Sequence, residues 1–246
     1  MNRTGLLVAV GVAAVVGALF GYLPQLDLYI SELFFAQDTR AFSWGHQPRL
    51  MVLRDASMWV IAALAMPAVV ALAAKLLRPR SRLLVPGRAI VLLLSTLALA
   101  PGLLTNVVLK EYWGRSRPID VHEFGGAERF VPWWDPRGDC ARNCSFVAGE
   151  GAGAFWAFAP AALTPPPWRP LAYAAALAFG TATGALRIAF GGHFFSDVVF
   201  SGVFTFLIVW LMHGLLYRWA ATRTSDEAIE QGLERPGKSR LTRSND

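Results

Sequence analysis

Charged residues are scarce in this 246-residue sequence: they make up 16% of it, whereas hydrophobic residues make up 54%. This balance excludes an ordinary soluble globular domain, and it excludes a disordered chain, which needs low hydrophobicity. Because there are only two cysteines and no glycine period, the chain is neither a disulfide-rich scaffold nor a collagen. The remaining class is a polytopic membrane protein with an all-α fold.

About twenty apolar residues are needed to cross a bilayer as an α-helix. Six windows of this kind are present, at 5–23, 56–74, 89–109, 145–163, 171–186 and 198–216. The fourth contains one acid, Glu150, and the fifth is short unless it extends to Arg187. We therefore predict a six-transmembrane-helix bundle that forms one membrane domain over residues 1–221. The polar tail, 222–246, is expected to be solvated or partly helical and to carry no chemistry.

The net charge of +6 fits orientation in a membrane better than nucleic-acid binding, because the basic residues sit in short loops between apolar runs. With both termini in the cytoplasm, 13 of the 23 Lys and Arg residues fall on the cytoplasmic side. The dense basic run at 75–88 decides this orientation. We therefore expect a multi-pass protein of the inner, or plasma, membrane. Basic residues are normally enriched on the cytoplasmic side, so those at the outer helix ends need another explanation. There are four of them: Lys110, Arg115, Arg117 and Arg187.

Three clusters of polar residues fall on the outer face in this topology. In the first, Lys110 and Arg117 are seven residues apart, two turns if the helix continues, although Pro118 disfavours helix at Arg117. Snorkelling of these cations to lipid headgroups is the alternative interpretation.

In the second cluster, Gly191 and Gly192 permit a tight turn after Arg187. His193 and Asp197 are four residues apart, so the carboxylate could fix one imidazole tautomer and leave the other nitrogen as a nucleophile. The alternative is a structural, buried His–Asp pair.

The third cluster is the expected start of a helix, where Gly149 would let the backbone approach a phosphate closely. Gly149 and Gly153 also form a GxxxG pattern that serves helix packing, as do Gly180 and Gly184. Glu150 is an acid in an apolar helix start and should have a basic partner. Together the three clusters predict a phosphate site.

The motifs resemble those of the type 2 phosphatidic acid phosphatase (PAP2) superfamily, which are K-x6-R-P, then P-S-G-H, then S-R-x5-H-x3-D. The first is matched completely by residues 110–118, and the third is matched with correct spacing by Arg187, His193 and Asp197. The second departs from the pattern, because Val-Ala-Gly-Glu stands at 147–150, and Leu186 replaces the serine of the third.

This resemblance implies a metal-independent enzyme without cofactors, in which His193 attacks phosphorus to form a phosphohistidine and Asp197 orients it. The groups implied to hold the phosphate are Lys110, Arg117, Arg187 and the Gly149 amide. The family's general acid is the histidine of the second motif, where Glu150 stands here, and our hypothesis is that Glu150 takes that role. The competing interpretations are that Glu150 only braces Arg117 or Arg187, or that another group such as His122 supplies the proton.

Cys140 and Cys144 lie in the outer loop, where an oxidising compartment would permit a disulfide; zinc is not expected, because no second ligand pair is evident. The leading functional prediction is a phosphatase that acts on a phosphorylated lipid at the periplasmic or extracellular face, and a lipid A phosphatase is one candidate. The alternatives are a lipid phosphotransferase, and a catalytically silent relative or transporter that binds an anionic lipid. The sequence gives no oligomeric state.

Overall fold

The computed structural model describes residues 1–242, and the side chains of residues 1–234. Within that part every regular element is a helix, apart from two isolated β-bridges, so the predicted all-α fold class is confirmed. The α-helices are α1 (Arg3–Tyr22), α2 (Gln25–Glu32), α3 (Pro48–Leu77), α4 (Gly87–Leu97), α5 (Lys110–Tyr112), α6 (Gly149–Phe155), α7 (Phe158–Leu163), α8 (Arg169–Ala189), α9 (Phe195–His213) and α10 (Asp226–Thr242). A π-helical segment, Ala98–Leu109, joins α4 to α5, and another, Gly214–Arg218, extends α9.

Five helical segments in the described part are long and apolar enough to cross a membrane: Arg3–Tyr22, Pro48–Leu77, Gly87–Tyr112, Arg169–Ala189 and Phe195–Arg218. They correspond to five of the six predicted windows. Their surfaces carry large hydrophobic side chains such as Leu7 and Trp59, which are 71% and 75% exposed. A soluble monomer rarely presents such surfaces, whereas lipid solvates them favourably. The chain is therefore a multi-pass membrane protein.

The fourth predicted span, at 145–163, is not one continuous helix. Its first residues form a loop, and the two short helices that follow, α6 and α7, are separated by a break at Trp156 and Ala157. Pro160 explains the break, because proline donates no backbone hydrogen bond and its ring clashes with the carbonyl of the residue four positions earlier, here Trp156. The prediction of a single helix was wrong here. Six spans remain a prediction, since neither α6 nor α7 alone would cross a bilayer.

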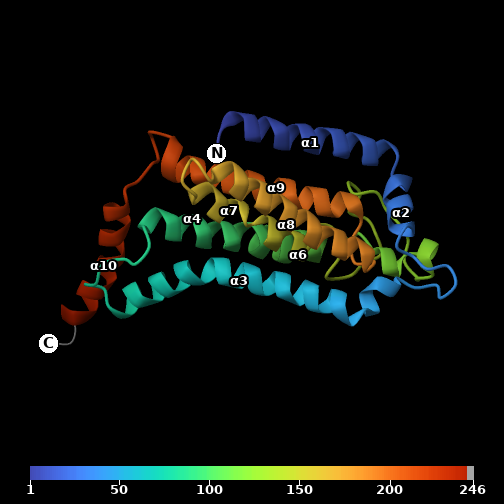
Figure 1. Ribbon diagram of the computed structural model, residues 1–246, viewed down its shortest axis with the longest axis horizontal. Coiled ribbons are helices and arrows are strands. Elements are labelled where there is room, and N and C mark those ends of the chain that lie inside the picture. Colours follow the sequence, from blue (N-terminus) through green and yellow to red (C-terminus); the bar gives the residue numbers. More distant parts are fainter. Residues whose placement is uncertain (243–246) are drawn as a thin grey trace.

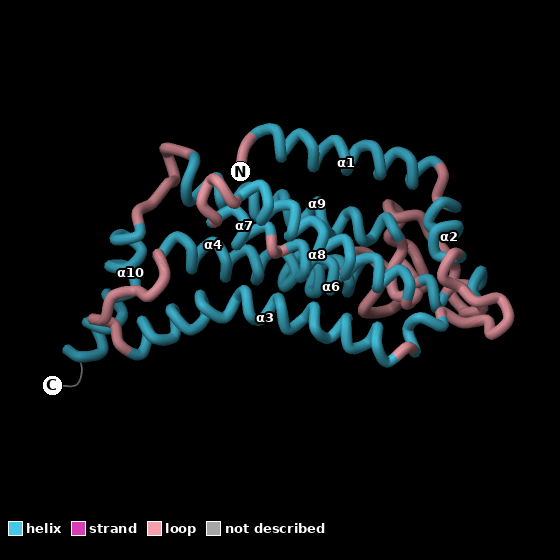
Figure 2. The backbone as a smooth tube through the Cα atoms, viewed as in Figure 1, coloured by secondary structure: helices cyan, strands magenta, loops and turns pink. Residues whose placement is uncertain are grey.

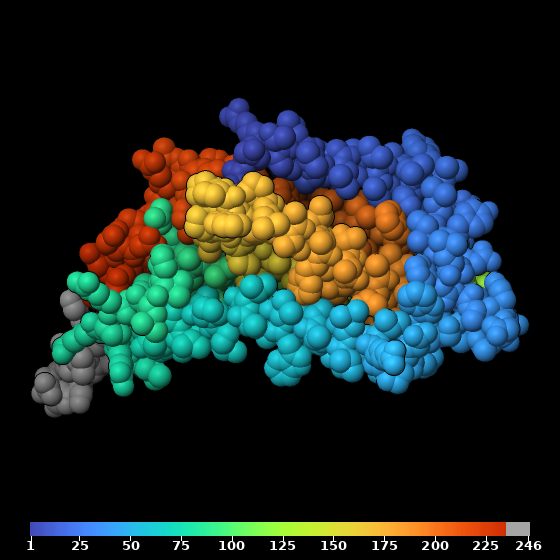
Figure 3. All heavy atoms as spheres, in the orientation of Figure 1, coloured from blue at the N-terminus to red at the C-terminus, as the bar shows by residue number. Residues whose placement is uncertain are grey.

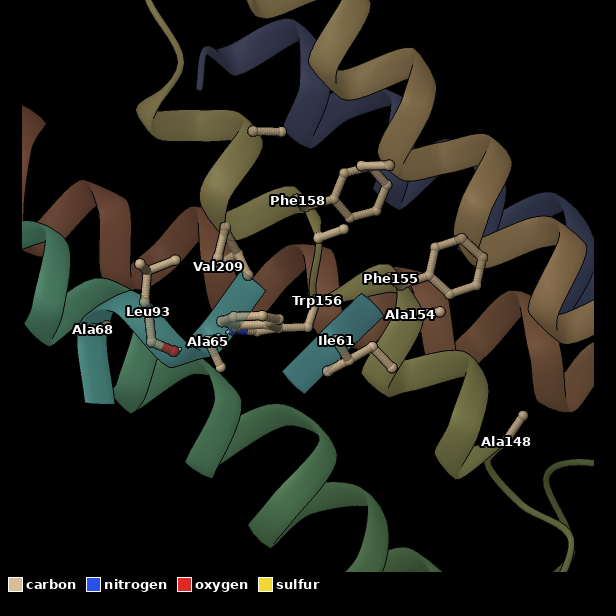
Figure 4. Close-up of a cluster of buried hydrophobic side chains, with 14 of the residues drawn as sticks. Ile61, Ala65, Ala68, Leu93, Ala148, Ala154, Phe155, Trp156, Phe158 and Val209 are labelled. Atoms are coloured by element: carbon tan, nitrogen blue, oxygen red, sulfur yellow. Dashed lines mark hydrogen bonds between the residues drawn. The ribbon is translucent and has the colours of Figure 1, made fainter. Parts of the chain in front are cut away.

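The break places Trp156 in the centre of the hydrophobic core (Figure 4). Its side chain is fully buried, and its indole N–H donates to the Leu93 carbonyl at 3.2 Å and to Thr96 Oγ1 at 2.9 Å, both on α4. Buried indole N–H groups need such partners. The broken helix is thus anchored to α4 at the point where α6 ends.

Two glycines of α8 let that helix pack closely on its neighbours. A Cβ atom at Gly180 would lie 2.1 Å from Phe155 Cδ1 on α6, and one at Gly184 would lie 2.2 Å from Val198 Cγ1 on α9. Small residues at such contacts are how membrane helices approach each other. The contacts hold α6, α8 and α9 together, and the start of α6, the end of α8 and the start of α9 carry the second and third sequence clusters.

The bundle has two different ends. The N-terminus of α1 and the whole of α10 lie toward one end, and α2 lies at the other (Figure 1). Most of the loops gather at the α2 end (Figure 2). Along the bundle, the surface of α8 is visible between α1 and α3 (Figure 3). The three sequence clusters therefore lie at the end opposite α10.

The described helix of the polar tail docks on the bundle. This helix, α10, places Glu230 and Glu234 each 3.0 Å from Lys75 Nζ at the end of α3. Asp226 pairs with Arg88 of α4 at 2.9 Å. The tail is partly helical, as expected, but its docking was not predicted, because ion pairs leave no apolar stripe in a sequence. The division of the chain at residue 221 stays a prediction.

Candidate functional site

Lys110 and Arg117 converge on one residue, Asn143. Lys110 Nζ donates to Asn143 Oδ1 at 3.2 Å, and Arg117 Nε and Nη2 donate to the Asn143 carbonyl at 3.1 and 2.7 Å. The helix does not continue between the two cations, since α5 ends at Tyr112 and the chain turns at Gly114, where φ is +73°. A loop contact, rather than helical phase, therefore brings the two together. Arg117 is extended, as the following proline predicts.

The start of α6 meets the same cations. A Cβ at Gly149 would lie 3.1 Å from Lys110 Nζ, so glycine lets this backbone approach the ammonium group. Glu150 accepts hydrogen bonds from Arg54 of α3, with Nε 3.0 and 2.9 Å from its two oxygens and Nη2 2.6 Å from Oε1. Arg187 Nη1 lies 3.7 Å from the same Oε1. Sequence reasoning named Arg187 or Arg117 as the partner of Glu150; Arg187 is one, and the closer partner, Arg54, was not anticipated.

Arg187 lies at the end of α8, beside the turn that precedes His193. Gly191 has a φ of +68° and makes the tight turn that the glycine pair predicts. A Cβ at Gly192 would lie 2.5 Å from Arg187 Nη2, so this glycine leaves space for the guanidinium group. The Arg187 Nε is buried and has no hydrogen-bond partner among the described residues. A buried N–H of this kind is available to a bound anion.

His193 is held in one tautomer by a backbone carbonyl. Its Nδ1 lies 2.7 Å from the Ser145 oxygen, and because a carbonyl only accepts, Nδ1 carries the proton and Nε2 keeps a free lone pair. Asp197 Oδ2 lies 3.9 Å from Nδ1, beyond hydrogen-bond distance. It accepts instead from the Ser145 hydroxyl and from the Phe194 N–H. Asp197 therefore does not bond to the imidazole directly, as the spacing suggested. It is linked to His193 through Ser145, whose hydroxyl bonds to Asp197 and whose carbonyl bonds to His193.

The electrostatics of the site favour a neutral imidazole. Burial is the largest cause that lowers the pKa of His193 well below its ordinary value, and the neighbouring charges of Arg187, Lys110 and Arg117 lower it further, against the Ser145 hydrogen bond, which raises it. The three predicted cations thus lie close enough to act on this ring. A buried, uncharged nitrogen beside three cations is suited to attack an anionic electrophile.

A buried ionic network supports the site from beneath. Arg115 is fully buried, donates to Asp197 and to Ser196 Oγ, and pairs with Asp27 of α2 at 2.8 Å. Its guanidinium carbon also lies 4.4 Å from the centre of the Phe194 ring. The network continues through Asp197 to Ser145, which holds His193. Nothing in the sequence singled out Asp27. Arg115 was noted only as a basic residue whose position at an outer helix end was unexplained.

The two cysteines shape the loop that carries Asn143. Cys140 and Cys144 form a disulfide with a Cα–Cα distance of 5.7 Å, and Asn143 lies inside the ring that it closes, with a φ of +53°. The Cys144 N–H donates to the Lys110 carbonyl at 2.9 Å. The bridge therefore restrains the residue on which both Lys110 and Arg117 converge. The described residues contain no group of three or more His, Cys, Asp or Glu side chains able to hold a metal ion.

The remaining histidines of this end do not join the site. His122 is exposed, and its Nδ1 lies 3.3 Å from the Gly126 carbonyl, with no contact to the cations described above. His46 is also exposed, in the turn Ser43–His46 before α3. Among the three histidines at this end of the bundle, the geometry therefore singles out His193.

Comparisons with known proteins point the same way as the geometry. The lipid A 4'-phosphatase of Francisella tularensis subsp. novicida (strain U112) is 41% identical over 132 residues, which are 53% of this chain and 60% of that protein. The lipid A 4'-phosphatase of Rhizobium leguminosarum is 47% identical over 106 residues, 43% of this chain and 46% of that protein. The chain thus spans about half the length of these relatives. No solved structure matches it significantly.

The family comparison covers the whole candidate site. The PAP2 superfamily matches residues 89–223, which is more than half of the chain and includes each cluster from Lys110 to Asp197. The departures of the second motif, at 147–150, and of Leu186 lie inside the matched region. The chain therefore belongs to the PAP2 superfamily.

Proposed function

We propose that this protein is an integral membrane phosphatase that hydrolyses a phosphate ester of a lipid, with lipid A, or a glycolipid of similar chemistry, as its substrate. The observation that carries the proposal is the buried His193, whose Nδ1 is engaged by the Ser145 carbonyl, so that Nε2 is left free, and whose ring is close enough to Lys110, Arg117 and Arg187 to feel their charges. Family membership and relatives named as lipid A 4'-phosphatases support it.

The chemistry proceeds in two displacements at phosphorus. His193 Nε2 attacks, the ester P–O bond breaks, and the lipid oxygen leaves and takes up a proton. Water then attacks the phosphohistidine, the P–N bond breaks, and inorganic phosphate leaves with the imidazole restored. Lys110, Arg117, Arg187 and the Gly149 amide hold the phosphate oxygens and offset the charge that builds up on them.

Asp197 contributes through Ser145. Its carboxylate accepts hydrogen bonds from the Ser145 hydroxyl and from the N–H of Phe194, the residue after His193. The carbonyl of Ser145 in turn fixes the imidazole. This arrangement orients the nucleophile without placing a second charge directly on it.

Glu150 is better suited to bracing cations than to donating a proton. Its carboxylate accepts three hydrogen bonds from Arg54 and has Arg187 nearby, so it is an ion-pair acceptor with no proton to give. This supports the brace interpretation over the general-acid hypothesis. The proton that the leaving alkoxide needs then comes from another donor.

The site faces the periplasm or the exterior in this proposal, with both termini in the cytoplasm. The support is the distribution of charge: the basic run 75–88 lies at the α10 end of the bundle, and the site lies at the opposite end. The disulfide in the site loop agrees with an oxidising compartment on that side.

The decisive experiment is phosphate release from lipid A by the purified protein in detergent, with EDTA present. The wild type should release inorganic phosphate, His193→Ala should lose the activity, and His46→Ala, an exposed histidine at the same end, should keep it. A phosphate-labelled acceptor lipid without free phosphate would indicate transfer instead of hydrolysis. Activity that survives in His193→Ala, or that EDTA abolishes, would overturn the proposal.

A further inference from the structure

Arg54 belongs to none of the three clusters, yet it makes the shortest contact that Glu150 has. It lies near the start of α3, and its Nη2 is 2.6 Å from Glu150 Oε1 while Nε contacts both carboxylate oxygens. The Arg54 side chain is 36% exposed and that of Glu150 is 17% exposed. Two-point contact of this kind fixes the orientation of a carboxylate as well as its charge.

One oxygen of Glu150 is shared between two guanidinium groups. Oε1 accepts from Arg54 and also lies 3.7 Å from Arg187 Nη1. The looser contact to Arg187 leaves that side chain with spare donors, including a buried Nε without a partner among the described residues. Arg187 is thus steadied by Glu150 but not saturated by it.

We propose that Arg54 is a positioning residue for the phosphate site: it holds the Glu150 carboxylate so that Arg187 is steadied and its remaining donors stay free for phosphate. This inference rests on the proposed function. It assigns a role to a residue of α3, a helix that carries none of the family's motifs.

Charge explains why the pair is needed. A lone carboxylate among phosphate-binding cations would repel a phosphate and would bind Arg187 as its main partner. With Arg54 present, the negative charge of Glu150 is already neutralised from the side of α3. The arrangement therefore keeps Glu150 as a structural link without lowering the affinity of the site for an anion.

A double-mutant cycle tests this role. Arg54→Ala should leave Glu150 unpaired, raise KM for the phosphorylated lipid, and weaken competitive inhibition by inorganic phosphate about tenfold or more, with a smaller change in kcat. The double variant Arg54→Ala/Glu150→Ala removes the unpaired acid and should recover phosphate affinity to the level of Glu150→Ala, which lacks only the steadying of Arg187. Arg54→Lys, which keeps the charge but not the two-point contact, should be intermediate.

The matched control is Arg49→Ala, because Arg49 is an exposed arginine on the same helix with no ion pair or hydrogen bond to a described side chain. It should behave as wild type. Thermal unfolding of every variant reports whether a loss reflects folding, and Glu150→Ala provides a variant in which Arg54 is untouched. If the double variant is as impaired as Arg54→Ala or worse, the positioning role is wrong.

The cycle also separates this role from acid catalysis and from the proposed function itself. If Glu150 is the general acid, Glu150→Ala loses about 10²- to 10⁴-fold in kcat and the double variant does not recover. If wild type releases no phosphate, the proposed function fails, whereas protection of the protein by inorganic phosphate against thermal unfolding still measures the cycle. Additive losses of that protection would overturn the role of Arg54 alone.

Discussion

The two ends of the bundle each bury one cation between two carboxylates, but the partners differ in their exposure to solvent. At the site end, the side chains of Arg115, Asp27 and Asp197 are all 0–1% exposed. At the α10 end, Lys75 is 0% exposed, but Glu230 and Glu234 are 28% and 36% exposed. The first network is desolvated throughout, and the second keeps its acids in contact with water.

This difference separates what each network does. A fully buried ion network is expensive to break, because removing one partner leaves uncompensated charge out of water. Partly exposed carboxylates can be hydrated when their partner is lost, so their ion pairs contribute much less to the free energy of unfolding. The Arg115 network leads to His193 through Asp197 and Ser145, whereas Lys75 leads only to α10. We therefore expect the first to determine activity and the second to determine docking of the tail.

The largest expected effect is that of Arg115→Met. This change leaves Asp27 and Asp197 buried without their cation, and the loss of stability should be about 3–5 kcal/mol. Displacement of Asp197 and Ser145 by a fraction of an ångström should also lower kcat, by about 10²-fold. Thermal unfolding and phosphate release in detergent measure the two effects.

The control for that change is Arg129→Ala. Arg129 is an arginine of the same loop region, paired with Asp139 at 3.6 Å, with both side chains largely exposed. Its stability should change by no more than about 1 kcal/mol, with activity intact. Equal losses of stability and activity in Arg115→Met and Arg129→Ala would mean that burial of the network does not increase its contribution.

Lowering the pH should also distinguish the two ends, with a smaller effect on stability than Arg115→Met. The pKa of His193 is lowered by burial and then by its cationic neighbours, so the imidazole should stay neutral and active as pH falls through about 6.5, the ordinary value for histidine. Below that value the unfolded chain binds the proton more readily than the native site, so stability declines with falling pH. At lower pH still, through the depressed native pKa, kcat itself should fall.

At the α10 end a lowered pKa has a different consequence, because the group is an acid. Hydrogen bonds from Lys75 and then from the Leu83 N–H lower the pKa of Glu230, so the docking contact should persist below the ordinary range of glutamate and be lost as pH falls through the lowered value. The measurements are kcat at saturating lipid and protease sensitivity of the tail, each against pH. A kcat that halves near pH 6.5 would contradict the depressed pKa of His193.

The sequence was sufficient for the parts of this architecture that depend on local signals. Charge-free apolar runs predicted α1, α3 and α8, and the glycine pair at 191–192 predicted the turn before His193. Spacing within the motifs also predicted that Lys110, Arg187 and His193 lie near one another. These features need only neighbours along the chain, so they can be derived without a fold.

Long-range contacts were not predictable in the same way. The Arg115–Asp27 pair spans 88 residues and the Arg54–Glu150 pair spans 96, and nothing local to Asp27 or Arg54 indicates a partner. The break at Trp156 was different, because Pro160 is a local signal that hydropathy alone overlooks. Docking of α10 was missed because hydropathy does not register ion pairs.

The smallest expected effect is that of Lys75→Met, which tests the α10 end directly. Methionine keeps an apolar stem of similar length in the buried position, while Glu230 and Glu234 lose their cation and become hydrated. Docking of α10 should weaken, so proteolysis within residues 222–246 should become faster, while kcat and the thermal unfolding of the bundle should stay near those of wild type. Arg80→Met, which changes an exposed arginine in the loop that follows α3, should leave proteolysis unchanged. If Lys75→Met instead lowers phosphate release as far as Arg115→Met does, the two ends are coupled through the bundle, and the separation between them is wrong.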